Sequence, residues 1–245
     1  MMWVMSVANK ASSRLKYLND IMQTIEPPSR LTQFRRGLRR IKAREPLDQA
    51  PPMSRQALMS LLPQLPPAQS AALYIARRAA CRLDEITTLT GKKILQADVQ
   101  LGIIIWWAAD VKTAHDDPFR PETFVVIAPP HPSTNEEPNL WPAVVNFLRR
   151  LPPKAFLCRD KTVLVNALKT VDPCFSGHSI KSGAVTDLMV LAATNVLCPA
   201  AISAIPLVAK HRTVVPVFPA STVRYCRDKT AVAMALGTHN VTKYL

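Results

Sequence analysis

The sequence predicts an α+β fold that is mainly helical and contains one small antiparallel sheet. Apolar residues recur at helical spacing over most of the 245 residues. Two short runs, 101–108 and 123–127, are instead rich in isoleucine, valine and tryptophan, and they predict two strands separated by a polar connection. Because 48% of the residues are hydrophobic, the chain has ample material for a packed core.

The pattern of apolar residues in the N-terminal part of the sequence predicts two helices ahead of a domain boundary near residue 47. The first helix covers 13–25 and ends at a pair of prolines. The second covers about 31–42, and basic residues fill the faces that its apolar residues leave free: Arg35, Arg36, Arg39, Arg40 and Lys42. A proline-bearing linker follows at 45–52. We therefore predict a helical basic segment at 1–46 and a larger domain at 47–245.

The larger domain predicts helices on both sides of the two strands. Ser54 caps a helix at 55–62, and Pro67 begins a helix that runs to Ala80 and meets the segment 82–89, with Gly91 as its end. After the strands, further helices are expected at 140–151, 160–170, 179–194, 199–209 and 221–235.

The uncharged stretch 188–209 is about as long as a membrane span. Its polar residues and its prolines, Pro199 and Pro206, would leave backbone groups without hydrogen bonds in lipid. We therefore interpret it as two short buried helices, and we expect no membrane partner.

The charge balance favours a polyanionic partner. Lysine and arginine outnumber aspartate and glutamate by 31 to 17, which gives a net charge of +14. A ribosome-like or membrane-surface basic protein is the alternative that charge leaves open. Because no acid interrupts residues 30–44, the basic helix there predicts contact with DNA phosphates more than a merely solvated face. The five cysteines are scattered without a C-x-x-C pair, which indicates a reducing compartment and no zinc site.

Several side chains are candidates for phosphodiester chemistry. Such chemistry needs a nucleophile, cations that hold the phosphate oxygens, and a proton donor for the leaving oxygen. The candidates, in chain order, are Arg82, Lys112, His178, Lys181, His211 and Tyr225. A phenol has a pKa near 10, so a tyrosine nucleophile needs neighbouring cations and a proton acceptor. Taken singly, Arg82 is better explained as an arginine paired with Asp84 or Glu85 at the surface, and Tyr225 as a packed helix residue with its hydroxyl in solvent.

The order of these residues resembles the tyrosine recombinases, the family of phage integrases and related DNA strand-exchange enzymes, over about residues 50–235. Residues 82–89 are similar to the family's first box, residues 178–181 to the second, and Lys210–His211 to the third. Tyr225 follows His211 by fourteen residues, near where the nucleophile is expected. The resemblance implies a recombinase-like catalytic domain at 47–245 behind a partial core-binding domain at 1–46.

The resemblance also implies a role for each candidate. Arg82, Lys181 and His211 stabilise the phosphate, and His178 assists. Lys112 protonates the leaving oxygen, with Lys93 as the alternative, and Arg224 contacts DNA beside the nucleophile. Lys181 stands where most of the family has arginine, and it offers a point charge instead of a planar fork. The diverged recombinases of kinetoplastid transposable elements look similar at this box.

The implied function is site-specific DNA cleavage and rejoining through a 3′-phosphotyrosine, in the recombination or integration of a mobile element. The implied partners are double-stranded DNA and further copies of the chain in a tetramer. No cofactor or metal is expected, and the implied location is nuclear. The alternatives are a catalytically impaired DNA-binding relic of the same family, a basic protein-interaction module and a type IB topoisomerase.

Overall fold

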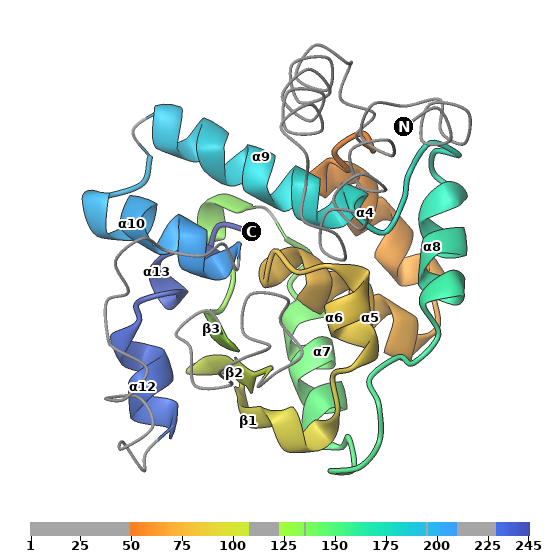
Figure 1. Ribbon diagram of the computed structural model, residues 1–245, viewed down its shortest axis with the longest axis horizontal. Coiled ribbons are helices and arrows are strands. Elements are labelled where there is room, and N and C mark those ends of the chain that lie inside the picture. Colours follow the sequence, from red (N-terminus) through yellow and green to blue (C-terminus); the bar gives the residue numbers. More distant parts are fainter. Residues whose placement is uncertain (1–49, 108–122, 135, 195, 210–228) are drawn as a thin grey trace, which may run out of the picture. The chain divides into compact units, whose positions relative to one another are not determined.

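The computed structural model describes residues 50–107, 123–134, 136–194, 196–209 and 229–245 (Figure 1). Contacts divide the chain between Gln49 and Ala50, so every described residue belongs to the C-terminal unit. The helices expected at 13–25 and 31–42 lie outside the described residues. So does 221–228, the first part of the last expected helix.

Helices make up most of the described chain, and they surround one small sheet (Figure 1). The α-helices are α4 (Arg55–Leu61), α5 (Pro67–Arg78), α6 (Leu83–Thr87), α7 (Leu140–Arg149), α8 (Lys161–Lys169), α9 (Ser179–Ala193), α10 (Pro199–Val208), α12 (Lys229–Ala235) and α13 (His239–Thr242). The 3₁₀ helices are η1 (Leu62–Gln64), η2 (Gly91–Lys93) and η6 (Pro132–Thr134), and the strands are β1 (Ile94–Asp98), β2 (Gly102–Trp106) and β3 (Phe124–Ile127). The expected class, mainly α with a small antiparallel sheet, is confirmed for these residues.

Local capping explains why several helices begin where the sequence predicts. The Ser54 hydroxyl accepts a hydrogen bond from the Ala57 amide at 3.1 Å, at the start of α4. The Asp160 carboxylate does the same for the second and third residues of α8. Helix α5 begins at Pro67, whose missing amide proton costs nothing in the first turn.

The chain turns sharply between α5 and α6. Ala80 has a φ of 42°, and the Cys81 amide donates to the Ala76 carbonyl at 3.0 Å, so α5 stops at Arg78. Helix α6 then ends at Thr87, and Gly91 begins η2 instead of ending a helix as expected. A Cβ at Gly91 would lie 2.4 Å from the Pro152 carbonyl oxygen, so the absence of a side chain lets these two segments approach.

The sheet is antiparallel with the order β1–β2–β3. The expected pairing of the two isoleucine- and valine-rich runs is confirmed, with Ile105 opposite Val125. Strand β1 was not expected, because its sequence does not alternate strictly between apolar and polar residues. In the structure its five residues are all half-buried. Its position depends on the tight turn at 99–101, where the Asp98 carboxylate accepts hydrogen bonds from two amides.

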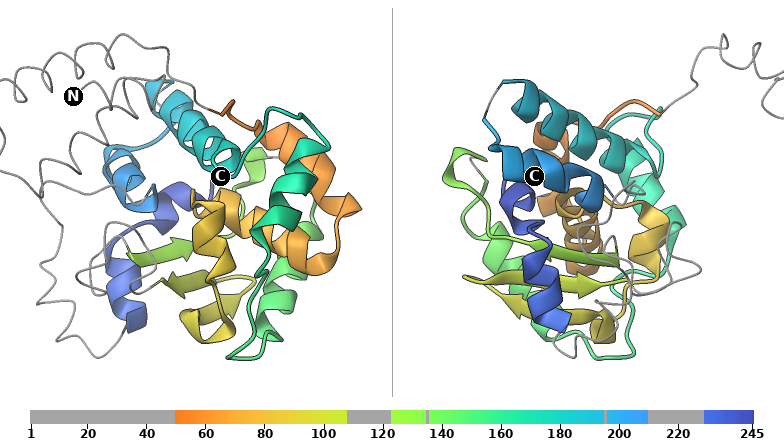
Figure 2. Two further views of the ribbon diagram at one scale, coloured as in Figure 1. Left: turned by 45° about the vertical axis from the view of Figure 1, so that its right-hand side comes forward. Right: turned by 60° about the vertical axis from the view of Figure 1, so that its left-hand side comes forward.

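Helices lie on both faces of the sheet (Figure 2), and the residues of β2 and β3 are buried except for the half-buried Trp106. Ile103, Ile105 and Val125 pack in the core that contains α4 to α8. Their sequence neighbours Ile104 and Val126 pack on the opposite face, with Leu207 of α10, Ala233 of α12 and Leu236. The period-2 alternation of strands therefore divides these apolar residues between two helical layers.

Helices α9 and α10 account for the uncharged stretch 188–209. They are separate, and Pro199 begins α10 as expected. The expectation that both are buried is wrong in part, because Met189, Val190 and Ile202 are 42–57% exposed. No helix among the described residues is both long and apolar enough to cross a membrane.

Helix α9 touches the chain just before α4 with no room for a side chain. The Met53 amide donates to the Ser179 carbonyl at 3.0 Å. A Cβ at Gly183 would lie 2.0 Å from the Met53 carbonyl oxygen and 2.7 Å from Nη1 of Arg77. Gly183 is therefore required by close packing.

Gly183→Ala is expected to destabilise the protein by about 1–3 kcal/mol, because the backbone of Met53 must move. The sign opposes the roughly 1 kcal/mol that alanine gains over glycine inside an unobstructed helix. Denaturant unfolding measures the difference. Gly177→Ala is the control, because its Cβ would meet the flexible end of Lys161 at 3.3 Å and Leu83 at an ordinary contact distance of 3.9 Å. An equal or greater stability for Gly183→Ala would contradict the packing described above.

Candidate functional site

Arg82 stands at the N-terminus of α6. Its backbone amide donates to Oε2 of Glu85 at 3.3 Å, and the Glu85 amide donates back to the Arg82 carbonyl at 3.0 Å. The Arg82 guanidinium lies 3.6 Å from Oε1 of Glu85 and keeps 32% of the side chain exposed. The pairing with Glu85 is therefore present, although the Glu85 carboxylate is buried; the pair is longer than a direct hydrogen bond and leaves the Arg82 side chain partly accessible.

The second box lies against α6. A Cβ at Gly177 would be 3.9 Å from Cβ of Leu83 and 3.3 Å from Cε of Lys161, so the glycine lies close to both side chains. Lys161 in turn pairs with Asp84 at 2.6 Å. The residues after Arg82 and before His178 are thus in contact, although they are separated by about ninety positions in the sequence.

A short turn presents His178 at the start of α9. The Ser176 amide donates to the Ser179 hydroxyl at 3.0 Å, and the His178 amide donates to the Ser176 hydroxyl at 3.2 Å. These bonds fix the backbone ahead of the helix. The His178 side chain itself is exposed. It is therefore available to a ligand at the surface beside α6.

Lys181 is buried, with 8% of its surface exposed. Its ammonium donates to the backbone carbonyl of Ala209, directly after α10. Ala209 precedes the Lys210–His211 motif of the third box. The second box is thus bonded to the residue from which the third box continues.

The β2–β3 connection also begins against α6. The indole nitrogen of Trp107 donates to the Glu85 carbonyl at 3.0 Å, and the Trp107 amide donates to the Thr123 carbonyl at 2.9 Å. The first bond fixes the start of the connection to the helix that carries Arg82 at its N-terminus. The second closes the base of the connection, and Lys112 belongs to it by sequence.

Lys93, the alternative proton donor, is half-buried after α6. Its ammonium donates to the Thr88 carbonyl at 2.7 Å. Burial lowers the pKa of Lys93, and the neighbouring charge of Lys92 lowers it further. A lowered pKa suits a general acid, so the structure adds a physical argument for this alternative.

The remaining candidates lie outside the described residues. They are Lys112, His211, Arg224, Tyr225 and the basic residues Arg35, Arg36, Arg39, Arg40 and Lys42. Their roles stay predictions. Of the six catalytic candidates, the structure describes Arg82, His178 and Lys181, and it brings the backbones around the first two together.

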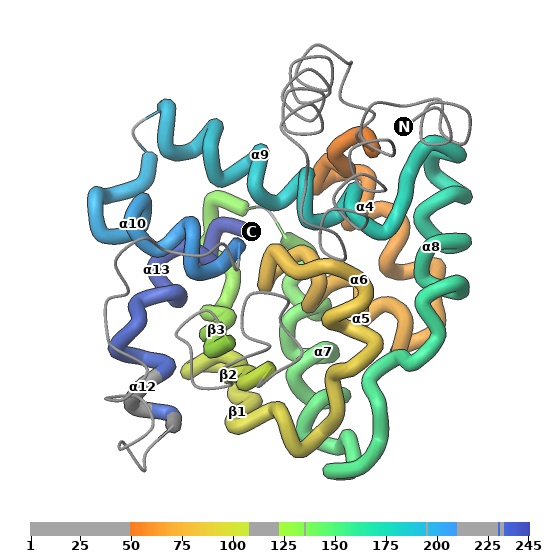
Figure 3. Tube along the Cα trace, in the orientation of Figure 1, coloured from red at the N-terminus to blue at the C-terminus, as the bar shows by residue number. Residues whose placement is uncertain are grey.

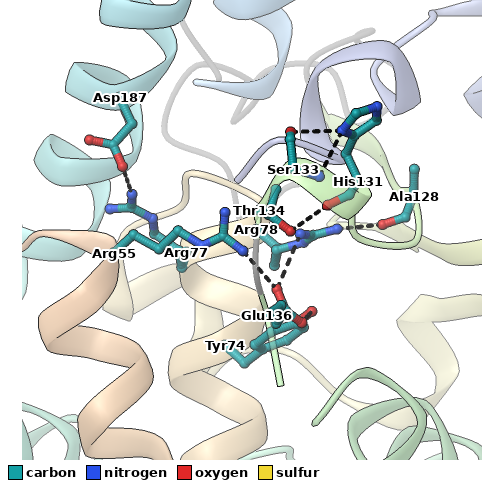
Figure 4. Close-up of polar contacts among 10 residues, drawn as sticks. All are labelled: Arg55, Tyr74, Arg77, Arg78, Ala128, His131, Ser133, Thr134, Glu136 and Asp187. Atoms are coloured by element: carbon teal, nitrogen blue, oxygen red, sulfur yellow. Dashed lines mark hydrogen bonds and ion pairs between the residues drawn. The ribbon is translucent and has the colours of Figure 1, made fainter. Parts of the chain in front are cut away.

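A buried polar network, which the sequence did not predict, lies beside α5 (Figure 4). Arg78 is fully buried, its guanidinium donates to the Ala128 carbonyl, and it lies 3.7 Å from Glu136. Arg55 reaches the same carboxylate at 3.2 Å, and the Tyr74 hydroxyl donates to it. Burial raises the pKa of Tyr74. Glu136 is 3% exposed, so its charge is compensated almost entirely within the protein.

Arg77 of the same helix forms a second polar network. Its guanidinium donates to the Met53 carbonyl at 3.0 Å and to Asp187 of α9 (Figure 4). Burial lowers the pKa of Arg77, and Asp187 opposes that change. The only sequence signal for both networks is the pair of arginines at the end of an apolar helix, a position where arginine is usually solvated.

A hollow of about 460 Å³ lies over the first network. Its walls include Pro129, Pro130, His131, Glu136, Pro138 and Trp141. None of the described catalytic candidates lines it, so we treat it as separate from the candidate site. Among the described residues, no group of three histidine, cysteine, aspartate or glutamate side chains is placed to hold a metal ion.

Lys181→Met is expected to destabilise the protein by about 1–3 kcal/mol, because methionine keeps the length of the side chain but leaves the buried Ala209 carbonyl without this donor. Denaturant unfolding tests it. Lys169→Met, at an exposed position of α8, is the matched control and should change stability by less than about 1 kcal/mol. Equal stabilities for the two variants would mean that the bond to Ala209 contributes nothing.

Comparison with known proteins gives no family for this chain. No protein-family model matches it, and neither does any curated protein or solved structure. We therefore infer function from its own residues and their contacts.

Proposed function

We propose that this chain cleaves and rejoins double-stranded DNA through a covalent 3′-phosphotyrosine at Tyr225. The proposal rests on the recombinase-like order of its motifs and on three contacts that join them. Leu83 lies close to Gly177, Trp107 donates to Glu85, and Lys181 donates to Ala209. In each contact, the residues are catalytic candidates or lie within a few positions of one.

The first of these contacts is the observation that carries the proposal. It brings the segments of Arg82 and His178 together at the surface, where both side chains are accessible. An arginine fork and an imidazole on neighbouring backbones suit a phosphate, because both offer N–H donors to its nonbridging oxygens. Helix α6 is the common support.

In the proposed reaction, His178 accepts the proton of the Tyr225 hydroxyl, the Tyr225 oxygen attacks phosphorus, and the bond from phosphorus to the 5′ oxygen breaks. The leaving oxygen takes a proton from Lys112, or from Lys93. Arg82, Lys181 and His211 stabilise the charged pentacoordinate phosphorus, and His178 assists. Rejoining is the reverse attack by a 5′ hydroxyl. The phosphotyrosine conserves the energy of the broken bond, so the reaction needs no nucleotide.

The same proposal makes the chain a protomer of a DNA-bound tetramer, of nuclear location, that serves the integration or excision of a mobile element. The N-terminal basic residues and Arg224 bind the phosphate backbone. A type IB topoisomerase would use the same chemistry and differ in releasing superhelical strain without exchanging partners.

A second candidate is a DNA-binding relic without cleavage activity. The burial of Lys181 favours it, because an ammonium bonded to the Ala209 carbonyl has fewer donors left for phosphate. A missing donor to the developing charge typically costs about 2.7–4 kcal/mol. The relic would bind DNA with a steep salt dependence and form no covalent link.

The cleavage proposal predicts a denaturant-resistant adduct between the protein and a nicked DNA duplex. The adduct is expected to disappear in Tyr225→Phe, because phenylalanine has no nucleophilic oxygen. Electrophoresis in detergent with labelled DNA measures it. Tyr244→Phe is the matched control: its ring lies against His131, it takes part in none of the three contacts, and it should keep the adduct.

An adduct that persists in Tyr225→Phe would refute this nucleophile. Salt-dependent DNA binding with no adduct in the parent chain would establish the relic instead. No duplex binding at all would leave the basic protein-interaction module as the remaining alternative.

The identity of the proton donor predicts a chemical rescue. Lys112→Ala is expected to slow cleavage of ordinary DNA by about 10²–10⁴-fold. Its rate should recover on DNA whose scissile 5′ oxygen is replaced by sulfur, because a thiolate is a much weaker base than an alkoxide and leaves without a proton. Single-turnover cleavage of both substrates measures this. Rescue of Lys93→Ala instead would assign the role to Lys93.

A further inference from the structure

Two segments far apart in the sequence form one surface after α6. The Leu157 amide donates to the Leu89 carbonyl at 2.8 Å, and the Gly91 amide donates to the Ala155 carbonyl at 3.1 Å. Thr90 and Phe156 form an antiparallel bridge between these bonds. Figure 3 shows the trace between α7 and α8 running along the turn that follows α6. The surface is therefore held by main-chain hydrogen bonds.

This surface is strongly basic. Residues 149–161 contain five basic side chains and one acid, Asp160, whose carboxylate caps α8. The facing segment adds Lys92 and Lys93, and the Lys92 amide donates to the Pro153 carbonyl at 2.9 Å. The exposed members without an acidic partner among the described residues are Lys92, Arg150, Lys154 and Arg159. Such an excess of positive charge is complementary to a phosphate backbone.

An aromatic ring stands among these charges. Phe156 is 42% exposed, although most large apolar side chains nearby are buried. The Arg159 guanidinium lies over the ring, 5.3 Å from its centroid. An exposed ring beside a cation and flanking lysines is the combination that proteins use to bind unpaired nucleotides, because bases stack on the ring while cations hold the phosphates.

We infer that residues 89–93 and 149–161 form a binding surface for single-stranded nucleic acid. Phe156 stacks on an unpaired base, and Lys92, Arg150, Lys154 and Arg159 contact the backbone. The ring makes the surface prefer single strands over duplexes. In a duplex the faces of the bases are stacked on one another, so only the phosphates can contact this surface. The inference goes beyond the proposed cleavage and does not require it.

The experiment uses the full chain carrying Tyr225→Phe, so that a covalent link cannot form and failure of the cleavage proposal leaves the result intact. Fluorescence anisotropy measures binding to labelled oligothymidine, oligouridine and an oligothymidine–oligoadenosine DNA duplex. In this background, Phe156→Leu and Phe156→Ala should each lose affinity for the single strands by about 5- to 150-fold. Duplex affinity should stay unchanged. The two single strands separate a DNA partner from an RNA partner.

Leucine at 156 keeps an apolar side chain, so the Phe156→Leu variant decides the outcome if Phe156→Ala fails to fold. Leu101→Ala is the matched control, because Leu101 is 69% exposed in the β1–β2 turn and should bind like the parent. Single-strand affinity that is equal in the parent and Phe156→Leu would overturn the inference. So would an equal loss for single strand and duplex.

The charges make a separate prediction. Lys92→Ala combined with Lys154→Ala should reduce the slope of log affinity against log salt by about 1.4 for a single strand, since each phosphate contact contributes about 0.7. Titration of the same oligothymidine at several salt concentrations measures the slope. An unchanged slope would mean that neither lysine contacts the backbone, and a parent chain whose affinity ignores salt would favour a protein partner for Phe156.

Discussion

The buried guanidinium of Arg77 is the constraint on which the arrangement of the described helices depends. A charge that is 1% exposed must be compensated, and Arg77 finds its partners in the Met53 carbonyl and in Asp187 of α9. Gly183 of α9 has no side chain where the guanidinium and the Met53 backbone pass. Helix α9 therefore has a fixed position on α5, because sliding it would separate Arg77 from its acid and push a neighbouring side chain into Met53.

The fixed position of α9 has consequences for the candidate site. His178 precedes the first turn of α9, and Lys181 lies in that turn, so both are carried to where α6 and the end of α10 meet them. Helix α6 is only five residues long, and it gains support from Trp107 and from the lysine of α8 that pairs with Asp84. A short helix supported from several sides can hold an arginine at its N-terminus in one orientation, which phosphate recognition requires.

The polar groups of this chain fall into two classes with different physical roles. The buried Arg78 and the half-buried Arg55 share the carboxylate of Glu136, so they give the loop after β3 a defined path more than they attract a ligand. Near Phe156, the side chains of Lys92, Arg150, Lys154 and Arg159 are exposed and have no acidic partner in the described part of the chain, so their field reaches solvent. The basic residues behind the net charge of +14 therefore do not contribute equally to the recognition of a polyanion, because the buried arginines contribute little.

The sequence by itself determined the features that local physics controls. Ser54, Pro67 and Asp160 begin helices, and the runs of β-branched residues at β2 and β3 pair as expected, because capping and alternation act over a few residues. The resemblance of its motifs to recombinase boxes also made Arg82 and His178 candidate site residues, whose roles stay predictions. Only the tertiary structure decided that Arg77 and Arg78 are buried, that β1 joins the sheet, and that Lys181 turns toward Ala209. These three features depend on residues that are distant in the sequence; the two partners of Arg77, for example, are 24 and 110 positions away. No local sequence pattern indicates which distant carbonyl or carboxylate will lie beside a side chain in the folded protein.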